Sequence, residues 1–430
     1  MDYLRQILKE MKAGRPCGIP SFCTANDIVI EACMEEARKT GSPVLVEATA
    51  NQVNQFGGYT GMKPADFRDF VYGIADRIHF PREGIILGGD HLGPLIWSSL
   101  PEKEAMDRAE ELVRLFVLAG FTKIHLDTSM KLGDDSKDGR LSDGTIAGRG
   151  ARLYRASIEA YEELRKEHPE AERPVFIIGS EVPIPGGAQE AEDSITVTSP
   201  ENLSATIEAY RKAFSDEGME DAFSDIIAVV VQPGVEFGDS DVFMYSREKA
   251  SRLTAYASSI DSIMLEGHST DYQSAECLRM MVEDGVGILK VGPALTFALR
   301  EGLYSLSLIE KLLLKEGRSD FIEVLEKAML EKPSSWQKHY HGSDEEKRIK
   351  RMFSYSDRCR YYLTDPAVKE AIDTLIRNID SIQIPMGMLH QFMPRQYRKV
   401  RDGLIGPDAR SLLKDSVASI IDDYSFATAR

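Results

Sequence analysis

The chain alternates between short apolar runs and longer amphipathic segments. The apolar runs are typical of buried strands in a parallel sheet, and they lie at residues 17–23, 43–48, 84–87, 123–126, 175–178, 226–231, 262–265 and 287–291. The segments between them have the 3.6-residue periodicity of helices, near residues 27–40, 64–78, 103–119, 148–167, 200–216, 247–258 and 273–284. A further helix is predicted at the N-terminus and another from about residue 294.

This alternation of strand and helix patterns predicts eight consecutive βα units. A doubly wound sheet is the rival architecture, but eight units without an internal break favour a (β/α)8 barrel. We therefore expect residues 1–300 to form an α/β TIM barrel preceded by a helix. Residues 301–430 are highly charged with helical periodicity, and we expect them to form a helical extension packed on the barrel.

Polar residues follow the predicted strands. In such barrels the chemistry lies at the carboxyl ends of the strands, which here carry Asn26, Glu47, Asp90, His91, Asp127, Glu181, Gln232, Glu266, His268 and Lys290. A single polar strand end means little, because loops contact water. Because acids or imidazoles follow most of the eight strands, we predict an active site at the carboxyl-terminal end of the barrel, which we call its mouth.

Three of these residues suit a divalent metal. His91, Glu181 and His268 supply two imidazoles and a carboxylate, a set that favours Zn²⁺ and also accepts Mn²⁺, Co²⁺ or Ni²⁺. Taken singly, each histidine is more often a hydrogen-bonded core residue. Gln232 is a poor zinc ligand, so we expect it to orient substrate.

The turns after the seventh and eighth strands predict a phosphate site. Ser269 and Thr270 offer hydroxyl groups, and Gly292 allows close backbone approach at the start of a helix. Ordinary turn and capping chemistry explains the same residues equally well. With Asn26 and Lys290, they complete our candidates for binding a sugar or its phosphate.

Composition narrows the classes of partner. The 430 residues carry a net charge of −17 with 43% hydrophobic residues, which fits a globular protein and disfavours nucleic acid or an anionic membrane. Five cysteines without a C-x-x-C pair, and the lack of an apolar leader or spanning segment, predict a cytoplasmic protein. The absence of a P-loop, a strand-linked dinucleotide fingerprint and a G-x-S-x-G elbow weighs against kinase, dehydrogenase and esterase activities.

Four longer motifs carry a family resemblance. Residues 88–94 (GGDHLGP), 123–129 (KIHLDTS), 179–187 (GSEVPIPGG) and 266–273 (EGHSTDYQ) resemble the D-tagatose-1,6-bisphosphate aldolase Z-subunit family. The resemblance implies a fold shared with class II, zinc-dependent ketose-bisphosphate aldolases. By that similarity His91, Glu181 and His268 match metal-site residues and Asp90 matches the catalytic acid. Gln232 departs from the pattern, because those aldolases have a zinc histidine there.

Members of the family that the chain resembles carry three different descriptions. Members are described as C4 epimerases that interconvert D-fructose and D-tagatose forms, as non-catalytic subunits of an aldolase, or as kinases. We predict a metal-dependent epimerase acting by retro-aldol chemistry, with Asp90 as base and Glu47, Asp127 and Glu266 as secondary candidates. The alternative is an accessory subunit partnering a class II tagatose-bisphosphate aldolase. In either case we expect a homo-oligomer.

Overall fold

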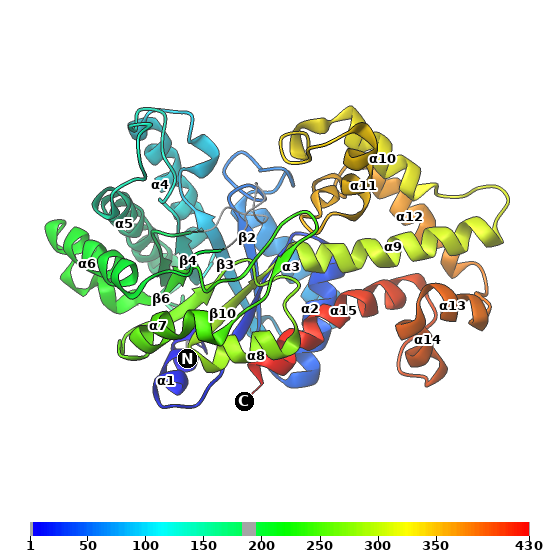
Figure 1. Ribbon diagram of the computed structural model, residues 1–430, viewed down its shortest axis with the longest axis horizontal. Helices are drawn as coiled ribbons and strands as arrows, with labels where there is room; N and C mark the ends of the chain where they lie inside the picture. Colours follow the sequence, from blue (N-terminus) through cyan, green and yellow to red (C-terminus); the bar gives the residue numbers. More distant parts are fainter. Residues whose placement is uncertain (1–2, 183–194, 430) are drawn as a thin grey trace.

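Eight parallel strands close into a barrel in the computed structural model, which describes residues 3–182 and 195–429 (Figure 1). The strands pair in the order β1-β10-β9-β6-β5-β4-β3-β2. Their bounds are β1 Ile19–Cys23, β2 Val44–Thr49, β3 Ile85–Leu92, β4 Lys123–Leu126, β5 Val175–Ile178, β6 Ile226–Val231, β9 Met264–Gly267 and β10 Val286–Val291. The predicted (β/α)8 barrel is thus confirmed, and every predicted strand overlaps an observed one.

Helices surround the barrel, and short capping side chains start many of them. They are α1 Tyr3–Lys12, α2 Asp27–Thr40, α3 Pro64–Ile78, α4 Glu102–Leu118, α5 Asp143–Glu167, α6 Pro200–Asp216, α7 Arg247–Ser258, α8 Ala275–Glu283 and α9 Pro293–Leu313. Side chains of Asn26, Ser142, Ser199, Ser246 and Ser274 accept N–H groups from the first turns. Within residues 3–182 and 195–429, no helix is long and apolar enough to cross a bilayer.

Strand β3 runs farther than the apolar pattern predicts, through Gly88 and Gly89 to Leu92. A Cβ at Gly88 would lie 2.6 Å from the Glu47 side chain, and one at Gly93 would lie 1.7 Å from the Asp127 carbonyl oxygen. Only glycine permits these approaches. The strand therefore carries Asp90 and His91 within its own ladder, in close contact with its neighbours.

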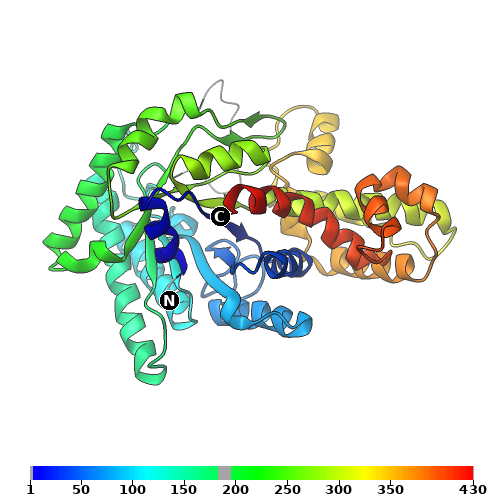
Figure 2. The same ribbon diagram turned by 90° about the horizontal axis from the view of Figure 1, so that it is seen from below.

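The chain beyond α9 forms a helical lobe on one side of the barrel (Figure 2). Its elements are α10 Phe321–Glu331, α11 Asp344–Phe353, the 3-10 helix η5 Arg358–Tyr362, α12 Pro366–Asp380, α13 Met386–Phe392, α14 Pro394–Arg401 and α15 Ala409–Thr428. Helix α9 spans the predicted boundary at residue 300, and α15 returns to pack against α2, α8 and α9. Ion pairs join this last helix to α2, with Arg410 and Lys414 lying 2.6 and 2.8 Å from Glu31.

Candidate active site

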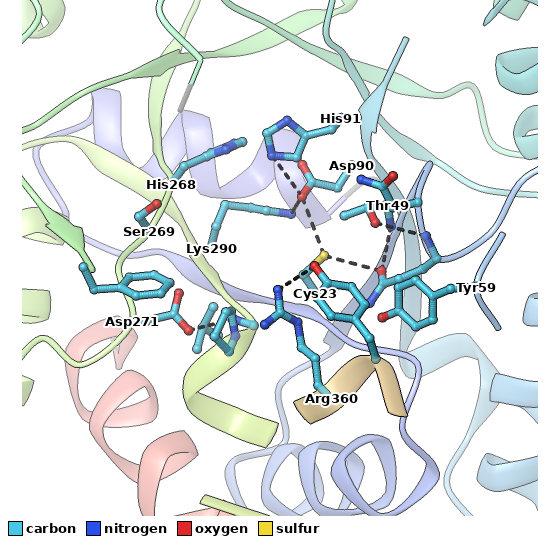
Figure 3. A pocket seen from close by; sticks show the side chains of 17 residues that line it. Cys23, Thr49, Tyr59, Asp90, His91, His268, Ser269, Asp271, Lys290 and Arg360 are labelled. Carbon is cyan, nitrogen blue, oxygen red and sulfur yellow. Dashed lines mark hydrogen bonds and ion pairs between the residues drawn. The ribbon is translucent and has the colours of Figure 1, made fainter. Parts of the chain in front are cut away.

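Three imidazoles meet at the carboxyl end of the barrel. The ring centroids of His91, His125 and His268 lie 4.9 to 5.1 Å from one another. One ligand atom from each, together with one from Asp90, lies within 4.8 Å of every other, and all four residues are buried. We call these four residues the imidazole cluster. Figure 3 shows Asp90, His91 and His268 around one pocket.

Each imidazole of the cluster has one nitrogen fixed by the protein. His91 Nδ1 lies 2.8 Å from Asp127 Oδ2, and His268 Nε2 lies 2.9 Å from Glu266 Oε1. His125 Nδ1 lies 3.0 Å from Asp90 Oδ1 and 3.1 Å from the backbone nitrogen of His91. Its buried Nε2 has no hydrogen-bond partner in the described part of the chain. Carboxylates that orient imidazoles in this way are typical of metal sites. The orphaned nitrogen and the donor set are compatible with a divalent metal ion.

Backbone strain is concentrated at the same place. His91 and Ser269, which both line the pocket, have φ values of 48° and 52°. Residues with a Cβ seldom adopt this left-handed conformation, which costs on the order of 1–3 kcal/mol and often marks a functional site.

The charges around the cluster favour a cation. Burial lowers the pKa of His268 to about 4, so this imidazole is neutral near pH 7, the form that binds metals. Burial opposes charge on His91, but Asp90 and Asp127 outweigh it and raise the pKa of His91. Burial would also raise the pKa of Asp90, yet His91 and Lys290 hold it well below its usual value. Asp90 is therefore ionised.

A buried ionic network lies next to the cluster. Lys123 Nζ lies 2.7 Å from Glu47 and 2.8 Å from Glu266, all three side chains being fully buried. Lys290 Nζ pairs with Glu47 and lies 2.9 Å from Asp90 Oδ2. Glu47 and Glu266, predicted to transfer protons or bind hydroxyl groups, are therefore already ion-paired. Lys290 lines the pocket, and its predicted role as a substrate ligand stays a prediction.

Glu181 does not join the imidazole cluster. Its Oε1 accepts a hydrogen bond from Asn202 Nδ2 at 2.6 Å and pairs with Arg140 at 3.1 Å. The residue lies beyond the end of β5, where its carboxylate already has these two partners. In the structure His125, from β4, stands where Glu181 was predicted. Residues 183–187 of the motif that contains Glu181 lie outside the described residues.

Three predicted substrate ligands have structural partners. Asn26 accepts two N–H groups at the start of α2, and Gln232 Oε1 accepts two N–H groups in the turn after β6. Thr270 Oγ1 donates to the Lys290 carbonyl at 2.7 Å and lies 2.9 Å from the Tyr424 hydroxyl. The side-chain oxygens of Asn26 and Gln232 and the hydroxyl of Thr270 thus hold turns and helices together, and a role of these residues in binding substrate stays a prediction.

The predicted phosphate position is already filled by a carboxylate. Asp271 Oδ1 accepts the N–H groups of Gly292 at 3.0 Å and Ala294 at 2.8 Å, at the start of α9. We call Thr270, Asp271, Gly292 and Ala294 the capped turn. Burial raises the pKa of Asp271 to about 6, so the carboxylate is mostly ionised near pH 7. A phosphate group would have to displace this anion, and the predicted site is not open in this structure.

The helical extension also reaches the mouth. Arg360 and Tyr361 of η5 line the pocket that contains Asp90, His91 and His268 (Figure 3). Sequence reasoning missed both Arg360 and His125. A signal existed for His125, because Lys123 and His125 alternate in β4 and alternate residues of a barrel strand face its interior. Arg360 lies in an ordinary charged stretch and carries no such signal.

Comparison with known proteins agrees with this architecture. Residues 4–429 match the model of the D-tagatose-1,6-bisphosphate aldolase subunit GatZ/KbaZ-like family. The chain belongs to this family. A crystal structure of a probable tagatose 6 phosphate kinase from Sinorhizobium meliloti 1021 is 46% identical, with a TM-score of 0.87 over 96% of this chain and 100% of that one.

Two aldolase structures are more distant from this member of the GatZ/KbaZ-like family. The fructose-bisphosphate aldolase of Campylobacter jejuni is 15% identical, with a TM-score of 0.42 over 87% of this chain and 91% of that one. The YdjI aldolase of Escherichia coli K12 is 11% identical, with a TM-score of 0.40 over 85% and 94%. At this level of similarity neither bears on the chemistry of the site.

Proposed function

We propose that this GatZ/KbaZ-like protein is a metal-dependent C4 epimerase that interconverts the D-fructose and D-tagatose forms of a ketohexose or its 6-phosphate. The observation that carries the proposal is an ionised carboxylate, Asp90, beside three buried imidazoles. Such a site unites a proton acceptor with ligands for a Lewis acid, and a retro-aldol cleavage between the α- and β-carbons of a ketone needs both.

The proposed ligands are His91, His125 and His268, with zinc the metal best suited to three imidazoles. Bound there, a divalent ion would polarise the C2 carbonyl of the sugar. Asp127 and Glu266 hold two of the imidazoles in orientation through the 2.8 and 2.9 Å contacts described above.

Asp90 acts as the base in this proposal. It accepts the proton of the C4 hydroxyl group, C4 becomes an aldehyde, and the electron pair of the C3–C4 bond moves to the C2 carbonyl. The aldehyde rotates and recondenses through its other face, Asp90 returns the proton, and C4 is inverted. Lys290, 2.9 Å from Asp90 Oδ2, keeps the carboxylate in place.

An accessory role is the second candidate, because the matching family model describes an aldolase subunit. In this role the chain would support a separate class II aldolase without turning over sugar itself. The imidazole cluster favours the catalytic role, since a purely supporting subunit has no need of a buried, orphaned imidazole nitrogen.

Metal-stripped protein reloaded with Zn²⁺, Mn²⁺, Co²⁺ or Ni²⁺ tests the proposal. We expect this protein to convert D-fructose or D-fructose 6-phosphate to the tagatose form. Chromatography of the sugars measures the conversion. His268→Ala should abolish conversion, whereas the exposed His168, at the far end of α5, provides a matched control as His168→Ala.

Absence of product with every metal would reject the epimerase. If the inactive protein nevertheless activates a separate tagatose-bisphosphate aldolase on mixing, and His268→Ala retains that effect, the accessory role is the correct one.

A further inference from the structure

A chain of buried charged side chains crosses the interior of the barrel and begins and ends in the imidazole cluster. Each member pairs with the next, in the order Asp90, Lys290, Glu47, Lys123, Glu266 and His268. We call these six residues the ionic chain. Its two ends, Asp90 and His268, belong to the imidazole cluster. In Figure 3 the Lys290 side chain extends toward Asp90.

Lys123 joins the two halves of the ionic chain. Its Nζ lies 2.7 Å from Glu47 Oε1 and 2.8 Å from Glu266 Oε2, and all three side chains are fully buried. Strand β4, which carries Lys123, pairs with β3 and β5. Glu47 and Glu266 come from β2 and β9, which do not pair with β4 in the described barrel. The ammonium group therefore connects strands that lie apart in the sheet.

Packing alone does not explain a lysine at this position. Ile177, Val230 and Ile288 belong to an apolar cluster formed by strands of the same barrel. A buried ion pair has a large desolvation cost, and replacing one by apolar side chains is often neutral or stabilising. An apolar residue at position 123 would therefore fill the barrel at least as well as the lysine does.

Glu266 links Lys123 to one end of the ionic chain. Its Oε2 pairs with Lys123, and its Oε1 lies 2.9 Å from His268 Nε2. Burial would raise the pKa of Glu266, but Lys123 and His268 outweigh it and hold that pKa well below its usual value. An ionised carboxylate only accepts hydrogen bonds. His268 therefore carries its proton on Nε2, and its Nδ1 is the nitrogen left for a ligand.

Glu47 links Lys123 to the other end of the ionic chain. Its Oε1 pairs with Lys123 and its Oε2 with Lys290, whose Nζ lies 2.9 Å from Asp90 Oδ2. Each of the two glutamates thus divides its oxygens between Lys123 and a residue in contact with the imidazole cluster. One ammonium group is in place to fix the orientation of both carboxylates.

We propose that Lys123 is a positioning residue of the active site, which holds Glu266 so that His268 keeps its Nδ1 available to a metal ion, and holds Glu47 so that Lys290 keeps Asp90 in place. The inference rests on the proposed function, because it takes the imidazole cluster to be a metal site. Lys123 itself contacts neither substrate nor metal and acts through the two glutamates.

Lys123→Met tests this role, because methionine keeps much of the aliphatic length of lysine and lacks the ammonium group. We expect the affinity of the metal-stripped full chain for Zn²⁺ to fall on the order of 10-fold, the lower end of the range for residues that support metal ligands. Competition with a chelating dye measures the affinity. The visible absorption bands of bound Co²⁺, which respond to the geometry of its ligands, should shift as well.

Arg149→Met is the matched control. Arg149 is also a buried cation, 2.7 Å from Asp135 and 2.9 Å from Glu102, but it lies on α5 and outside the pocket of the imidazole cluster. This variant should lose stability and keep both the Zn²⁺ affinity and the Co²⁺ bands. Unchanged affinity and bands in Lys123→Met, or equal changes in the two variants, overturn the inference, because Lys123 would then be a structural residue only.

If Lys123→Met does not fold, the double variant Lys123→Met with Glu47→Gln decides the question by comparison with Glu47→Gln alone. The double variant loses one negative charge together with the positive one, and Glu266 still lacks its partner. A Zn²⁺ affinity about 10-fold below that of Glu47→Gln supports the inference, and equal affinities overturn it.

Sugar turnover enters none of these measurements, so an inactive protein that binds metal tests Lys123 equally well. If the unaltered protein binds no divalent metal, the proposed function has failed, and NMR of the metal-free chain with ¹⁵N-labelled histidine decides the role of Lys123. The ring signals of His268 are identified by their loss in His268→Ala. A proton on Nε2 that is no longer confined there in Lys123→Met supports the positioning role, and identical ring signals in the two proteins reject it.

Discussion

Two parts of the barrel mouth use polar residues in opposite ways. In the imidazole cluster each ring has one nitrogen held by the protein, and the buried Nε2 of His125 has no partner among the described residues. In the capped turn the donors are satisfied, because Asp271 accepts both N–H groups at the start of α9 and Thr270 bonds to Lys290 and Tyr424. The difference shows that the partners of a polar residue, rather than its type or its place at a strand end, separate a ligand site from a structural one.

The largest effect is expected at Asp90, the proposed base of the imidazole cluster. Asp90→Asn leaves an amide that cannot accept the C4 proton, so we expect turnover to fall about 10²- to 10⁴-fold. The imidazoles remain, and metal content should stay close to that of the unaltered protein. Steady-state kinetics and elemental analysis of the same preparation provide the measurement. Loss of metal in parallel with turnover would make Asp90 a ligand and assign the base elsewhere.

His125 should bind metal if the orphaned nitrogen marks an open position. We expect His125→Ala to weaken metal affinity at least about 10- to 100-fold, the range typical of residues that only support metal ligands. Competition with a chelating dye measures the affinity, and His168→Ala on the surface should leave it unchanged. An unaltered affinity in His125→Ala would place the metal away from β4.

Asp271→Ala should open the capped turn. It leaves the N–H groups of Gly292 and Ala294 without their acceptor, so we expect a loss of about 1–3 kcal/mol in the free energy of unfolding. Inorganic phosphate should restore part of the loss by binding at the exposed helix start. Denaturant titrations with and without phosphate test this. A variant whose stability is indifferent to phosphate would show that the turn has no anion-binding capacity even when uncapped.

The ion pairs between α2 and α15 lie apart from the imidazole cluster and the capped turn. Removing them should change the stability of the protein but not its turnover. Burial would raise the pKa of Glu31, but Arg410, Lys414 and Arg77 outweigh it and lower the pKa to about 2. We expect Glu31→Gln to cost about 1 kcal/mol at pH 7, a modest value because solvent screens the partly exposed partners. Urea titration at several pH values measures this cost.

The sign of the pH dependence at Glu31 follows from its lowered pKa. Its contribution is complete above about pH 4.3, the pKa of an unfolded glutamate, and is lost as the pH falls toward 2. The difference between Glu31→Gln and the unaltered protein should therefore shrink in acid. Glu36→Gln, which removes the exposed pair with Lys39, should show little effect at any pH.

The barrel was predictable because its signal is local. Apolar runs such as 226–231, where all six residues are buried, identify strands without knowledge of their neighbours. Strand β3 exceeded its prediction because Gly88 and Gly89 look like a turn. Their place in the strand depends on Glu47, Leu92 and other side chains that crowd them from adjacent elements.

The site was predictable only in part. Placement at strand ends brought Asp90, His91 and His268 together correctly, since the closed barrel forces strand ends to converge. The position of Glu181 after a strand could not show that its carboxylate accepts a hydrogen bond from Asn202 and pairs with Arg140. Such partners come from distant segments of the chain, and their geometry is absent from a one-dimensional pattern.

The return of α15 to the barrel has a consequence for biosynthesis. Glu31 of α2 and Arg410 of α15 are 379 residues apart, so at roughly 5–20 residues per second the ribosome needs on the order of 20–80 s to deliver the second after the first. During that interval the face of α2 that α15 covers has no partner. The nascent barrel therefore stays open to misfolding and to chaperones until α15 has been synthesised.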